Sequence, residues 1–453
     1  MRIFLLYSLV FGALPLVLFQ PYIGTLLWVW IAYMAPHKFT WGAAYYFPFA
    51  QVVAIATIGA WLISNEPKRL PLTGITGVML VFAGWITITT FYSLAPIEAE
   101  RKWDEVIKVI AMSLITYLLI QSKRRIFWLI ATIVFSIGFI GVKGGIFVLL
   151  TGGEYRVYGP PQGNLSANNA IGLGLAMVLP LARYLQTQVQ YLFVKWSLSI
   201  MMALSVLAIF ATYSRGAFLA LIAVVAYMLL RSRRAVLVAM ILVVGGVLGA
   251  TFMPEKWSDR VQSIQDYEMD LSAMSRLRMW RYGWSVATAR PILGGGFGVY
   301  PATEHYTKFG FALCEPGVTN ELTANCTMKG RSAHNIFMEV LGEHGFVGLA
   351  IYILLAVLAF TVTGWLRRLP PDRPDLQWAY NLAGALQASM VGFFAAGMFL
   401  NKAYLGVYYH LIVIAAAAAV VVRRELAKEP AIPGGVLSQD TVLGSKSLKT
   451  ANY

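Results

Sequence analysis

The sequence predicts an all-α polytopic membrane protein, and three observations lead to this fold class. Of the 453 residues, 58% are hydrophobic and only 13% are charged, and the mean hydropathy is +0.66. Soluble domains have charged residues at about 25% of positions. The apolar runs are about 17–25 residues long, which is the length of a helix that crosses the bilayer core. They are continuous rather than alternating, which favours helices over the strands of a membrane barrel.

The apolar spans follow a broken first stretch. Residues 1–36 are apolar, are interrupted at Gln20-Pro21 and carry only Arg2 as a leading charge. They lack a small-residue cleavage site, so we expect retained membrane structure rather than a signal peptide. The later spans cover residues 47–64, 74–93, 106–120, 126–150, 169–187, 196–212, 215–231, 235–253, 335–366, 377–400 and 403–422.

Basic clusters recur at every second connection between these spans. They are Lys68-Arg69, Lys123-Arg124-Arg125, residues 231–234, Arg367-Arg368 with Arg373, and Arg423-Arg424. The positive-inside rule assigns these connections to the cytoplasm and the alternate ones to the outside. The outer connections are then 94–105, 151–168, the Tyr213-Ser214-Arg215 junction, 254–334 and 400–403. This scheme predicts about 12 crossings if residues 1–36 make one net crossing from an internal Arg2.

The scheme divides the chain into four parts. They are N-terminal transmembrane helices (1–253), an outer loop module (254–334), C-terminal transmembrane helices (335–424) and a Gly- and Ser-rich tail (425–453) that we expect to be disordered in the cytoplasm. Residues 255–289 mix aromatics with charges at helical spacing, which predicts one or two amphipathic helices at the membrane surface. Cys314 and Cys326 share the module, and they can pair if it faces an oxidising compartment; otherwise they are free thiols.

Composition and motifs exclude several classes of function. The net charge is +15, but the chain has no soluble basic domain, so we expect membrane lipids rather than nucleic acid as partners. No phosphate-binding loop and no His-Glu-x-x-His helix occurs, which argues against ATP binding and a zinc protease. The five histidines are scattered without a Cys/His cluster, so we expect neither a metal nor another cofactor. The glycine run 294–298 does not lead from a strand into a helix, as a dinucleotide fingerprint would.

His334 stands at the outer mouth of a long apolar helix. A neutral imidazole there can accept a proton near neutral pH, which suggests general-base chemistry at a membrane surface. The alternative is a simple polar cap of the helix. Glu339 and Glu343 follow about one and two turns further along. They could orient the ring, or they could pair with loop arginines.

Several cations are predicted to lie outside, where the positive-inside rule disfavours arginine. The polar set comprises Lys143, Arg156, Asn168, Asn169, Arg215, Arg276, Arg278, Arg281 and Arg290. A guanidinium fork binds phosphate oxygens bidentately. We favour ligand binding for Arg215, and contact with lipid phosphates for Arg281 and Arg290. Arg276 and Arg278 could bind a ligand or pair with a nearby acidic residue, and the sequence does not decide between the two. Lys143 could belong to the site or extend to the lipid interface.

The order of these motifs resembles a known family. His334-Asn335-x-Phe-Met-x-x-Leu-x-Glu343-x-Gly345 resembles the hallmark helix of the O-antigen ligase and polymerase superfamily. Arg276-Leu-Arg-Met-Trp280, the run Pro291-Ile-Leu-Gly-Gly-Gly and the helix start Ser214-Arg215-Gly are similar to its upstream patterns, and the resemblance covers most of the chain. Residues 36–42, 141–145 and 155–161 resemble a branch labelled O-glycosylation ligases.

The resemblance implies a GT-C-like glycosyltransferase of the bacterial inner membrane with its active site facing the periplasm. Its reaction would be inverting and independent of metal. The donor would be a glycan on undecaprenyl pyrophosphate, and the acceptor a sugar hydroxyl of lipid A-core, as in lipopolysaccharide biosynthesis. A repeat-unit polymerase and a protein O-oligosaccharyltransferase are alternatives. A transporter is disfavoured, because transporters usually place ionisable groups at the midplane between related halves.

The resemblance and the residues together suggest roles. His334 is the expected general base, and Arg215 and Arg276 are expected to hold the pyrophosphate. Further candidates for the same anion are Arg278, Arg156 and Lys143. The supporting residues are Glu343, Glu339, Asn335, Asn168 and Asn169. Trp280 and Tyr213 either stack on sugar or lipid or serve as interfacial anchors.

Overall fold

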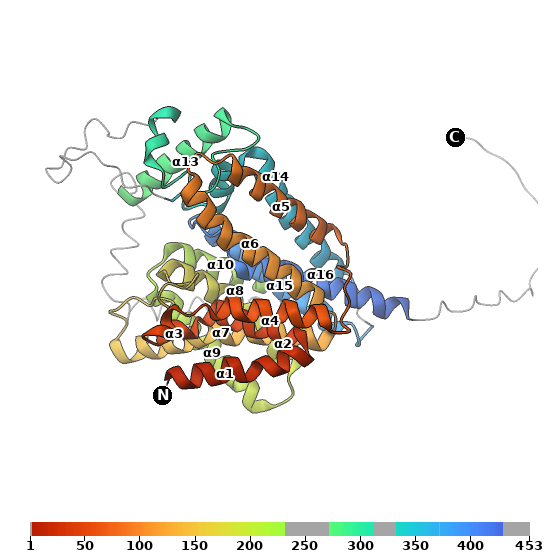
Figure 1. The fold of residues 1–453 in the computed structure, drawn as a ribbon. Coiled ribbons are helices and arrows are strands. Elements are labelled where there is room, and N and C mark those ends of the chain that lie inside the picture. The colour runs from red at the N-terminus through yellow and green to blue at the C-terminus, as the bar shows by residue number, and fades with distance from the viewer. Residues whose placement is uncertain (1, 232–270, 311–331, 371, 429–453) are drawn as a thin grey trace, which may run out of the picture.

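The computed structural model describes residues 2–231, 271–310, 332–370 and 372–428. This part of the chain contains helices and loops and no strand, which confirms the all-α prediction (Figure 1). The helices are α1 (Arg2–Phe19), α2 (Pro21–Met34), η1 (Pro36–Phe39), α3 (Ala43–Tyr46), α4 (Phe49–Ile63), α5 (Gly74–Phe91), α6 (Pro96–Leu119), α7 (Lys123–Thr151), α8 (Asn168–Gln188), α9 (Leu192–Ala211), α10 (Arg215–Leu230), α13 (Leu271–Ala289), η2 (Thr303–His305), η3 (Thr307–Phe309), α14 (Ile336–Leu366), α15 (Gln377–Gly397) and α16 (Gly406–Ala427).

The helices are those of a multi-pass membrane protein. Within the described residues, seven helices are long and apolar enough to cross a membrane, namely α1, α5, α7, α8, α9, α14 and α16. The helices α2, α4 and α10 are apolar but shorter. The predicted span 235–253, the cysteines Cys314 and Cys326, and residues 429–453 of the tail lie outside the described residues. The total of about 12 crossings therefore stays a prediction.

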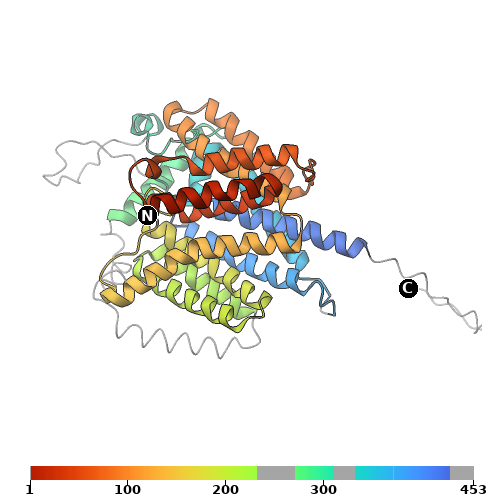
Figure 2. The same cartoon turned by 60° about the horizontal axis from the view of Figure 1, so that its bottom comes forward.

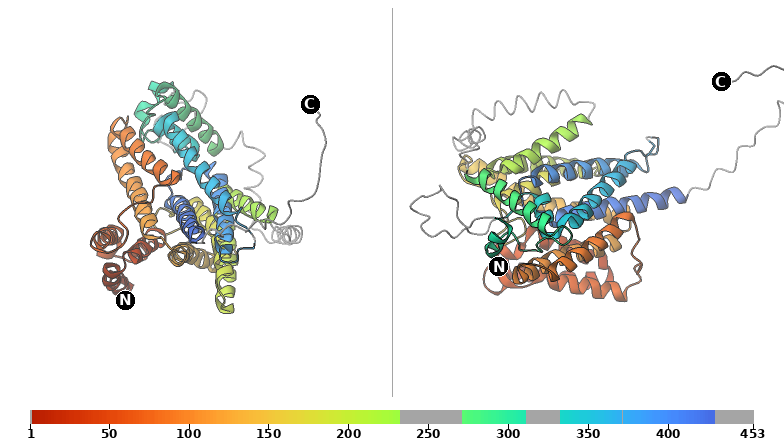
Figure 3. Two further views of the ribbon diagram at one scale, coloured as in Figure 1. Left: turned by 90° about the vertical axis from the view of Figure 1, so that its right-hand side faces the viewer. Right: turned by 90° about the horizontal axis from the view of Figure 1, so that it is seen from above.

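The centre of the bundle is formed by α8 and α16. Of the most apolar 18-residue window of each, 83% and 89% of residues are buried, whereas the value for α1 is 17%. Figure 3 shows α16 surrounded by other helices in its left-hand view. Small residues allow the close approach: a Cβ on Gly172 of α8 would lie 2.5 Å from the Cβ of Ala217 on α10. Such contacts suit helices in lipid, where close packing rather than water exclusion drives association.

The connections that the sequence assigned to the outside meet at one end of the bundle, which we call the outer end. Lys38 Nζ of η1 lies 3.3 Å from Gln162 Oε1 of the loop 152–167, and Lys402 Nζ lies 3.0 Å from Asn164 O of the same loop. Leu94 N bonds Gly295 O, 2.9 Å away, which joins the α5–α6 connection to the segment after α13. Alternate connections therefore share one end, as predicted.

The first stretch departs from the orientation scheme. The ring of Tyr7, near the start of α1, lies 5.2 Å from the ring of Phe49, and the ring of His37, just after α2, lies 5.9 Å from it. The two helices are therefore antiparallel, and α1 starts at the same end of the molecule as α13 (Figures 1 and 2). The single net crossing that the scheme required is absent. Pro21 opens α2 at the first helical position, where a missing N–H costs nothing, so the stretch forms two helices.

A kink at Gly345 divides α14 into an outer part, residues 336–344, and an apolar part, residues 346–366. Gly345 has φ 68° and ψ −172°, a conformation open essentially to glycine alone. The backbone groups that the kink frees bond the loop 291–297 instead: Gly295 N to Gly342 O and Gly296 N to Glu343 O, both at 2.8 Å, and Phe346 N to Pro291 O at 2.9 Å. The Pro291-Ile-Leu-Gly-Gly-Gly motif thus fixes the kink.

Candidate active site at the outer end of the bundle

The helices α10 and α14 begin in the same way at the outer end. Each is preceded by a capping residue, and before that by a residue with a left-handed backbone, Tyr213 (φ 51°) and His334 (φ 49°) respectively. Left-handed conformations are uncommon outside glycine and persist only where the surroundings impose them, often at functional sites. We call these two helix starts the α10 mouth and the α14 mouth.

The caps differ in the number of bonds that they make. Ser214 Oγ accepts one bond, from Ala217 N at 3.2 Å. Asn335 Oδ1 accepts two, from Phe337 N at 2.9 Å and Met338 N at 3.2 Å. Each cap satisfies N–H groups that a helix start leaves open, and it fixes the direction in which the chain enters the helix. Asn335, predicted as a supporting residue, is thus the cap that sets the backbone beside His334.

The end of α15 brings the two mouths together. A Cβ on Gly216, at the α10 mouth, would lie 3.4 Å from the Cβ of Phe399 just after α15. A Cβ on Gly397, the last residue of α15, would lie 2.4 Å from Ile336 Cδ1 at the α14 mouth. Arg215 and His334 are far apart in sequence, yet both therefore begin helices that flank the same end of α15.

The helix α13, which carries the predicted Arg276 and Arg278, lies beside the α14 mouth. Trp280 Nε1 donates to Ala333 O over 2.8 Å, directly beside His334. Arg276 lies one turn before Trp280 on the same helix face, and both Arg276 and Arg278 are partly exposed. A separate hydrophobic cluster holds α13 in place; it consists of Met279, Tyr282, Val286, Val299, Tyr300, Tyr306 and Ala333. The Tyr300 hydroxyl donates to Met338 O in the first turn of α14, so this cluster is tied to the mouth.

The other two arginines of this segment, Arg281 and Arg290, have different surroundings. Arg281 is exposed on the surface of α13. Arg290 donates through Nη2 to Tyr92 O at the end of α5, over 2.8 Å, and burial lowers the pKa of its guanidinium. This contact joins the end of α13 to the end of α5, a structural role for Arg290 that the sequence did not predict.

The loop 152–167 places Arg156 beside the α10 mouth. The loop is bonded to the end of α9, through Val157 N to Ala211 O at 2.9 Å. Asn168 Nδ2, at the start of α8, donates to Thr212 O over 2.8 Å. The Tyr213 hydroxyl donates to Gly153 O of the same loop. Burial raises the pKa of this hydroxyl, and the Arg156 guanidinium opposes the effect in part.

Lys143 and Asn169 lie at the same end with fewer contacts. Lys143 is exposed near the end of α7, and its Nζ lies 4.7 Å from the ring centre of Phe39 in η1. Asn169 is partly exposed in the first turn of α8, next to Asn168. The structure thus groups Lys143 with η1, while Arg156 and Asn168 belong to the surroundings of the α10 mouth.

Glu339 and Glu343 are buried, at 3% and 2% exposure, and both bond one lysine. Lys102 Nζ, from α6, lies 2.8 Å from Oε1 of each glutamate. The second carboxylate oxygens accept from the connection after α15: Ala403 N to Glu339 at 3.1 Å, and the Tyr404 hydroxyl to Glu343 at 2.8 Å. The partner of the acids is therefore neither of the groups that the sequence suggested, the imidazole or a loop arginine.

Lys102 is the main residue that sequence reasoning missed, although the sequence holds a signal for it. The start of α6 is highly charged, and this hides an apolar face formed by Ala99, Val106 and Ile110. Lys102 falls on that face at helical spacing. A lysine among buried apolar positions needs a carboxylate partner, and the two acids of α14 provide it. Lys402 was missed as well; burial lowers its pKa, and Glu339 opposes this in part.

Comparison with known families gives a match that covers this part of the chain. Residues 200–353 match the model of a family described as O-antigen ligase. That match runs from α9 to just past the kink of α14, so it contains both mouths and α13.

This match supports membership of the chain in the O-antigen ligase and polymerase superfamily.

The family match supports a glycosyltransferase-like activity in general, and it implies lipid-linked glycan and lipid substrates in a membrane. Residues 1–189 match the model of a family of unknown function, DUF5935, which therefore assigns no acceptor to the N-terminal half. No curated protein matches the chain. The two family matches are separated by residues 190–199, which cover the α8–α9 connection and the first two turns of α9.

Proposed function

We propose that this protein is an O-antigen ligase of the inner membrane that works at its periplasmic face. It transfers a polysaccharide from undecaprenyl pyrophosphate to a sugar hydroxyl of lipid A-core. One observation carries the proposal: His334 and Arg215 stand at two helix mouths that flank one end of α15, and α13 bonds the residue beside His334. A proton acceptor and permanent cations thereby meet at the end of the bundle that carries the predicted outer connections.

The reaction needs one proton transfer and one displacement. His334 accepts the proton of the acceptor hydroxyl while its oxygen attacks the anomeric carbon of the donor glycan. The bond from that carbon to the pyrophosphate oxygen breaks, and the electron pair leaves with undecaprenyl pyrophosphate. A single displacement of this kind inverts the anomeric configuration. The donor already carries an activated leaving group, pyrophosphate, so the reaction requires no nucleotide on the outer side.

The leaving pyrophosphate gains charge as the bond breaks. Arg215 and Arg276 hold it, because a guanidinium presents two parallel N–H donors to phosphate oxygens. The positive ends of the helix dipoles at the α10 and α14 mouths favour the same anion. Arg278 and Arg156 are further candidates from the same surroundings, and Lys143 is a more distant one.

The buried acids act on the site indirectly in this proposal. Two uncompensated carboxylates below an anion site would repel the donor, and Lys102 offsets them at 2.8 Å each. Their bonds to Ala403 and Tyr404 fix the connection after α15, against which both mouths are packed. Glu339, Glu343, Asn335 and Asn168 are thus supporting residues, and Asn169 stands beside them at the start of α8.

The test is transfer by the purified protein in liposomes with a defined donor. The donor is a glycan on undecaprenyl pyrophosphate, offered together with lipid A-core, with a periplasmic protein or alone. Glycan on lipid A-core supports the ligase. Elongation of the donor glycan without core identifies a polymerase, and glycan on a Ser or Thr identifies a protein O-oligosaccharyltransferase. Absence of transfer in every arm, for protein that remains folded, overturns the proposal.

A further inference from the structure

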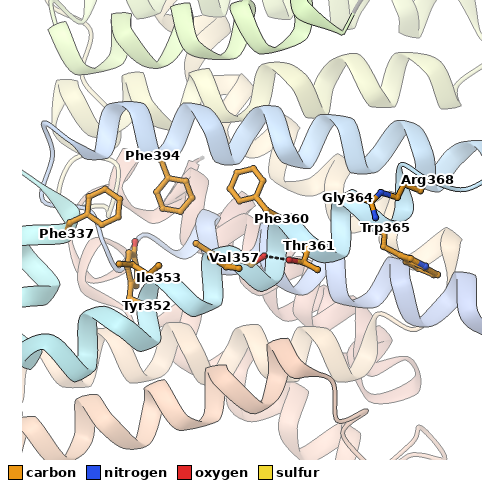
Figure 4. Close-up of a pocket in the computed structure, with 11 residues that line it drawn as sticks. Phe337, Tyr352, Ile353, Val357, Phe360, Thr361, Gly364, Trp365, Arg368 and Phe394 are labelled. Atoms are coloured by element: carbon orange, nitrogen blue, oxygen red, sulfur yellow. Dashed lines mark hydrogen bonds between the residues drawn. The ribbon is translucent and has the colours of Figure 1, made fainter. Parts of the chain in front are cut away.

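A long groove runs along the apolar part of α14 and starts near the α14 mouth (Figure 4). Its volume is about 770 Å³. The lining residues are Phe337, Tyr352, Ile353, Ala356, Val357, Phe360, Thr361, Gly364, Trp365 and Arg368 of the segment 337–368, and Phe394 of α15. Figure 4 shows Phe337 at one end and Arg368 at the other.

Small side chains create the space, and the two hydroxyl groups of its wall are already bonded. A Cβ added at Gly364 would meet no atom within 4 Å. The Thr361 hydroxyl donates to Val357 O, 2.8 Å away, and the Tyr352 hydroxyl donates to Ala403 O at 3.3 Å. Apart from Arg368 and the indole of Trp365 at the inner end, the groove thus offers mainly apolar surface. Its occupant must be apolar.

The dimensions suit a single hydrocarbon chain. From Tyr352 to Arg368 the groove spans 16 residue steps, or roughly 24 Å at about 1.5 Å each. A volume of about 770 Å³ over this length gives a mean cross-section of about 30 Å². The groove therefore accepts a single flexible hydrocarbon chain, and its length covers most of a bilayer core of about 30 Å.

The groove is continuous with the candidate active site. Phe337 belongs to the first turn of α14, three residues after His334, and its ring stacks on Phe394 with centres 6.1 Å apart. The Tyr352 hydroxyl bonds Ala403 O, and Ala403 N bonds Glu339 of the acidic pair. A chain in the groove would therefore start directly beside the α14 mouth.

We propose that this groove binds the polyisoprenyl tail of the lipid-linked donor, an inference that rests on the proposed function. The reacting carbon of the donor is bonded to the pyrophosphate, which is bonded directly to the tail, so the tail must begin close to His334. In the acceptor, core sugars separate the reacting hydroxyl from the acyl chains. A groove that ends at the α14 mouth thus suits the donor.

The groove orients the donor and adds little to the affinity for it. Lipid tails are as apolar as the groove wall, so moving a tail from bilayer to groove gains little from the hydrophobic effect. The gain comes from close contact and from holding the pyrophosphate in line with the acceptor hydroxyl. Blocking the groove should therefore raise the KM for a long-tailed donor about tenfold and leave a short-tailed donor almost unaffected.

The experiment uses the full chain in liposomes with two donors that carry the same glycan pyrophosphate. One donor has the undecaprenyl tail and the other a two-unit isoprenyl tail too short to follow the groove. Ala356→Phe and Gly364→Leu fill the groove, and Leu354→Phe on the same helix is the matched control, because Leu354 is 45% exposed and does not line it. We expect the first two variants alone to raise KM, and only for the long tail.

The outcomes separate the groove from the function. Equal effects on both donors, or none on the long-tailed donor, overturn the groove. A second measurement does not depend on transfer: undecaprenyl pyrophosphate with a photoreactive tail should label residues 352–368 in the wild type and lose this labelling in Gly364→Leu. If the wild type is labelled but transfers no glycan, the proposed function is refuted and the proposed groove is supported. Labelling spread over lipid-facing helices would identify ordinary membrane lipid as the occupant.

Discussion

The α10 and α14 mouths have the same backbone design but different support. Each has a left-handed residue followed by a cap. Behind the α10 mouth runs an unbroken helix that starts with a permanent cation, Arg215. Behind the α14 mouth the helix breaks at Gly345, and its outer part holds three buried ionisable groups, Glu339, Glu343 and His344.

The difference follows from what each mouth has to present. A cation that attracts an anion works over a range of positions, so a continuous helix is sufficient. A base must lie within hydrogen-bond reach of one hydroxyl, so its helix needs a fixed position. Side chains from α6 and from the connection after α15 bond the outer part of α14, and so does Thr89 of α5, whose Oγ1 lies 2.6 Å from His344 Nδ1. These bonds hold the outer part of α14, and with it the backbone beside His334, in a fixed position.

The largest effect should come from His334→Ala. Loss of a positioned base should lower the rate of glycan transfer by about 10²–10⁴. The protein should still insert and accumulate, because His334 precedes the helix and its cap. The measurement is the initial rate in liposomes beside the amount of protein in the membrane. His305→Ala is the matched control, since His305 bonds Leu94 O at 2.7 Å, away from the mouth, and should keep its rate. Full activity of His334→Ala would refute the base.

Arg215→Ala and Arg276→Ala should follow, with a loss of about 10²–10³ in donor turnover, the range for removing one preorganised donor to a developing anion. Arg→Lys should restore little at either position, because an ammonium lacks the bidentate fork. Rates are measured against donor concentration. Arg281→Ala, on the exposed side of α13, is the control that should keep both kinetic parameters. If Arg215 and Arg276 can both be replaced without effect, the pyrophosphate lies elsewhere.

The sequence predicted the parts of this comparison that depend on local pattern. The continuous apolar runs gave most of the helices, and the alternation of basic clusters gave the end at which the outer connections meet. The resemblance directed attention to His334 and Arg215. The structure adds that the two mouths flank one end of α15, which no spacing in the sequence could reveal.

The parts that could not be predicted depend on tertiary packing. The partner of Glu339 and Glu343 comes from α6, more than 200 residues earlier, and only the folded bundle selects Lys102 over the many arginines. The antiparallel α1 and α2 were missed because the positive-inside rule had a single charge, Arg2, to work with. The kink at Gly345 was missed because an isolated glycine in a helical pattern does not by itself indicate a break.

Lys102→Met tests the support of the α14 mouth. Removing the cation leaves two buried carboxylates without their partner, which should cost about 3–5 kcal/mol in the free energy of unfolding. The control is Lys108→Met on the same helix, whose bond to Asp104 joins side chains that are 47% and 52% exposed and should contribute within about 1 kcal/mol. Thermal unfolding of both purified variants gives the comparison. Equal losses would show that the buried cluster does not stabilise this end of α14.

The smallest effects should distinguish the two caps. Asn335 Oδ1 accepts two backbone N–H groups and Ser214 Oγ accepts one, so Asn335→Ala should lose the most. Cap removal costs about 0.5–2 kcal/mol, and we expect Asn335 near the upper end of that range and Ser214 near the lower. Amide hydrogen exchange in the first turns of α14 and α10 measures each loss locally. Faster exchange in α10 than in α14 would reverse the order, and the α10 mouth would then be the more tightly specified of the two.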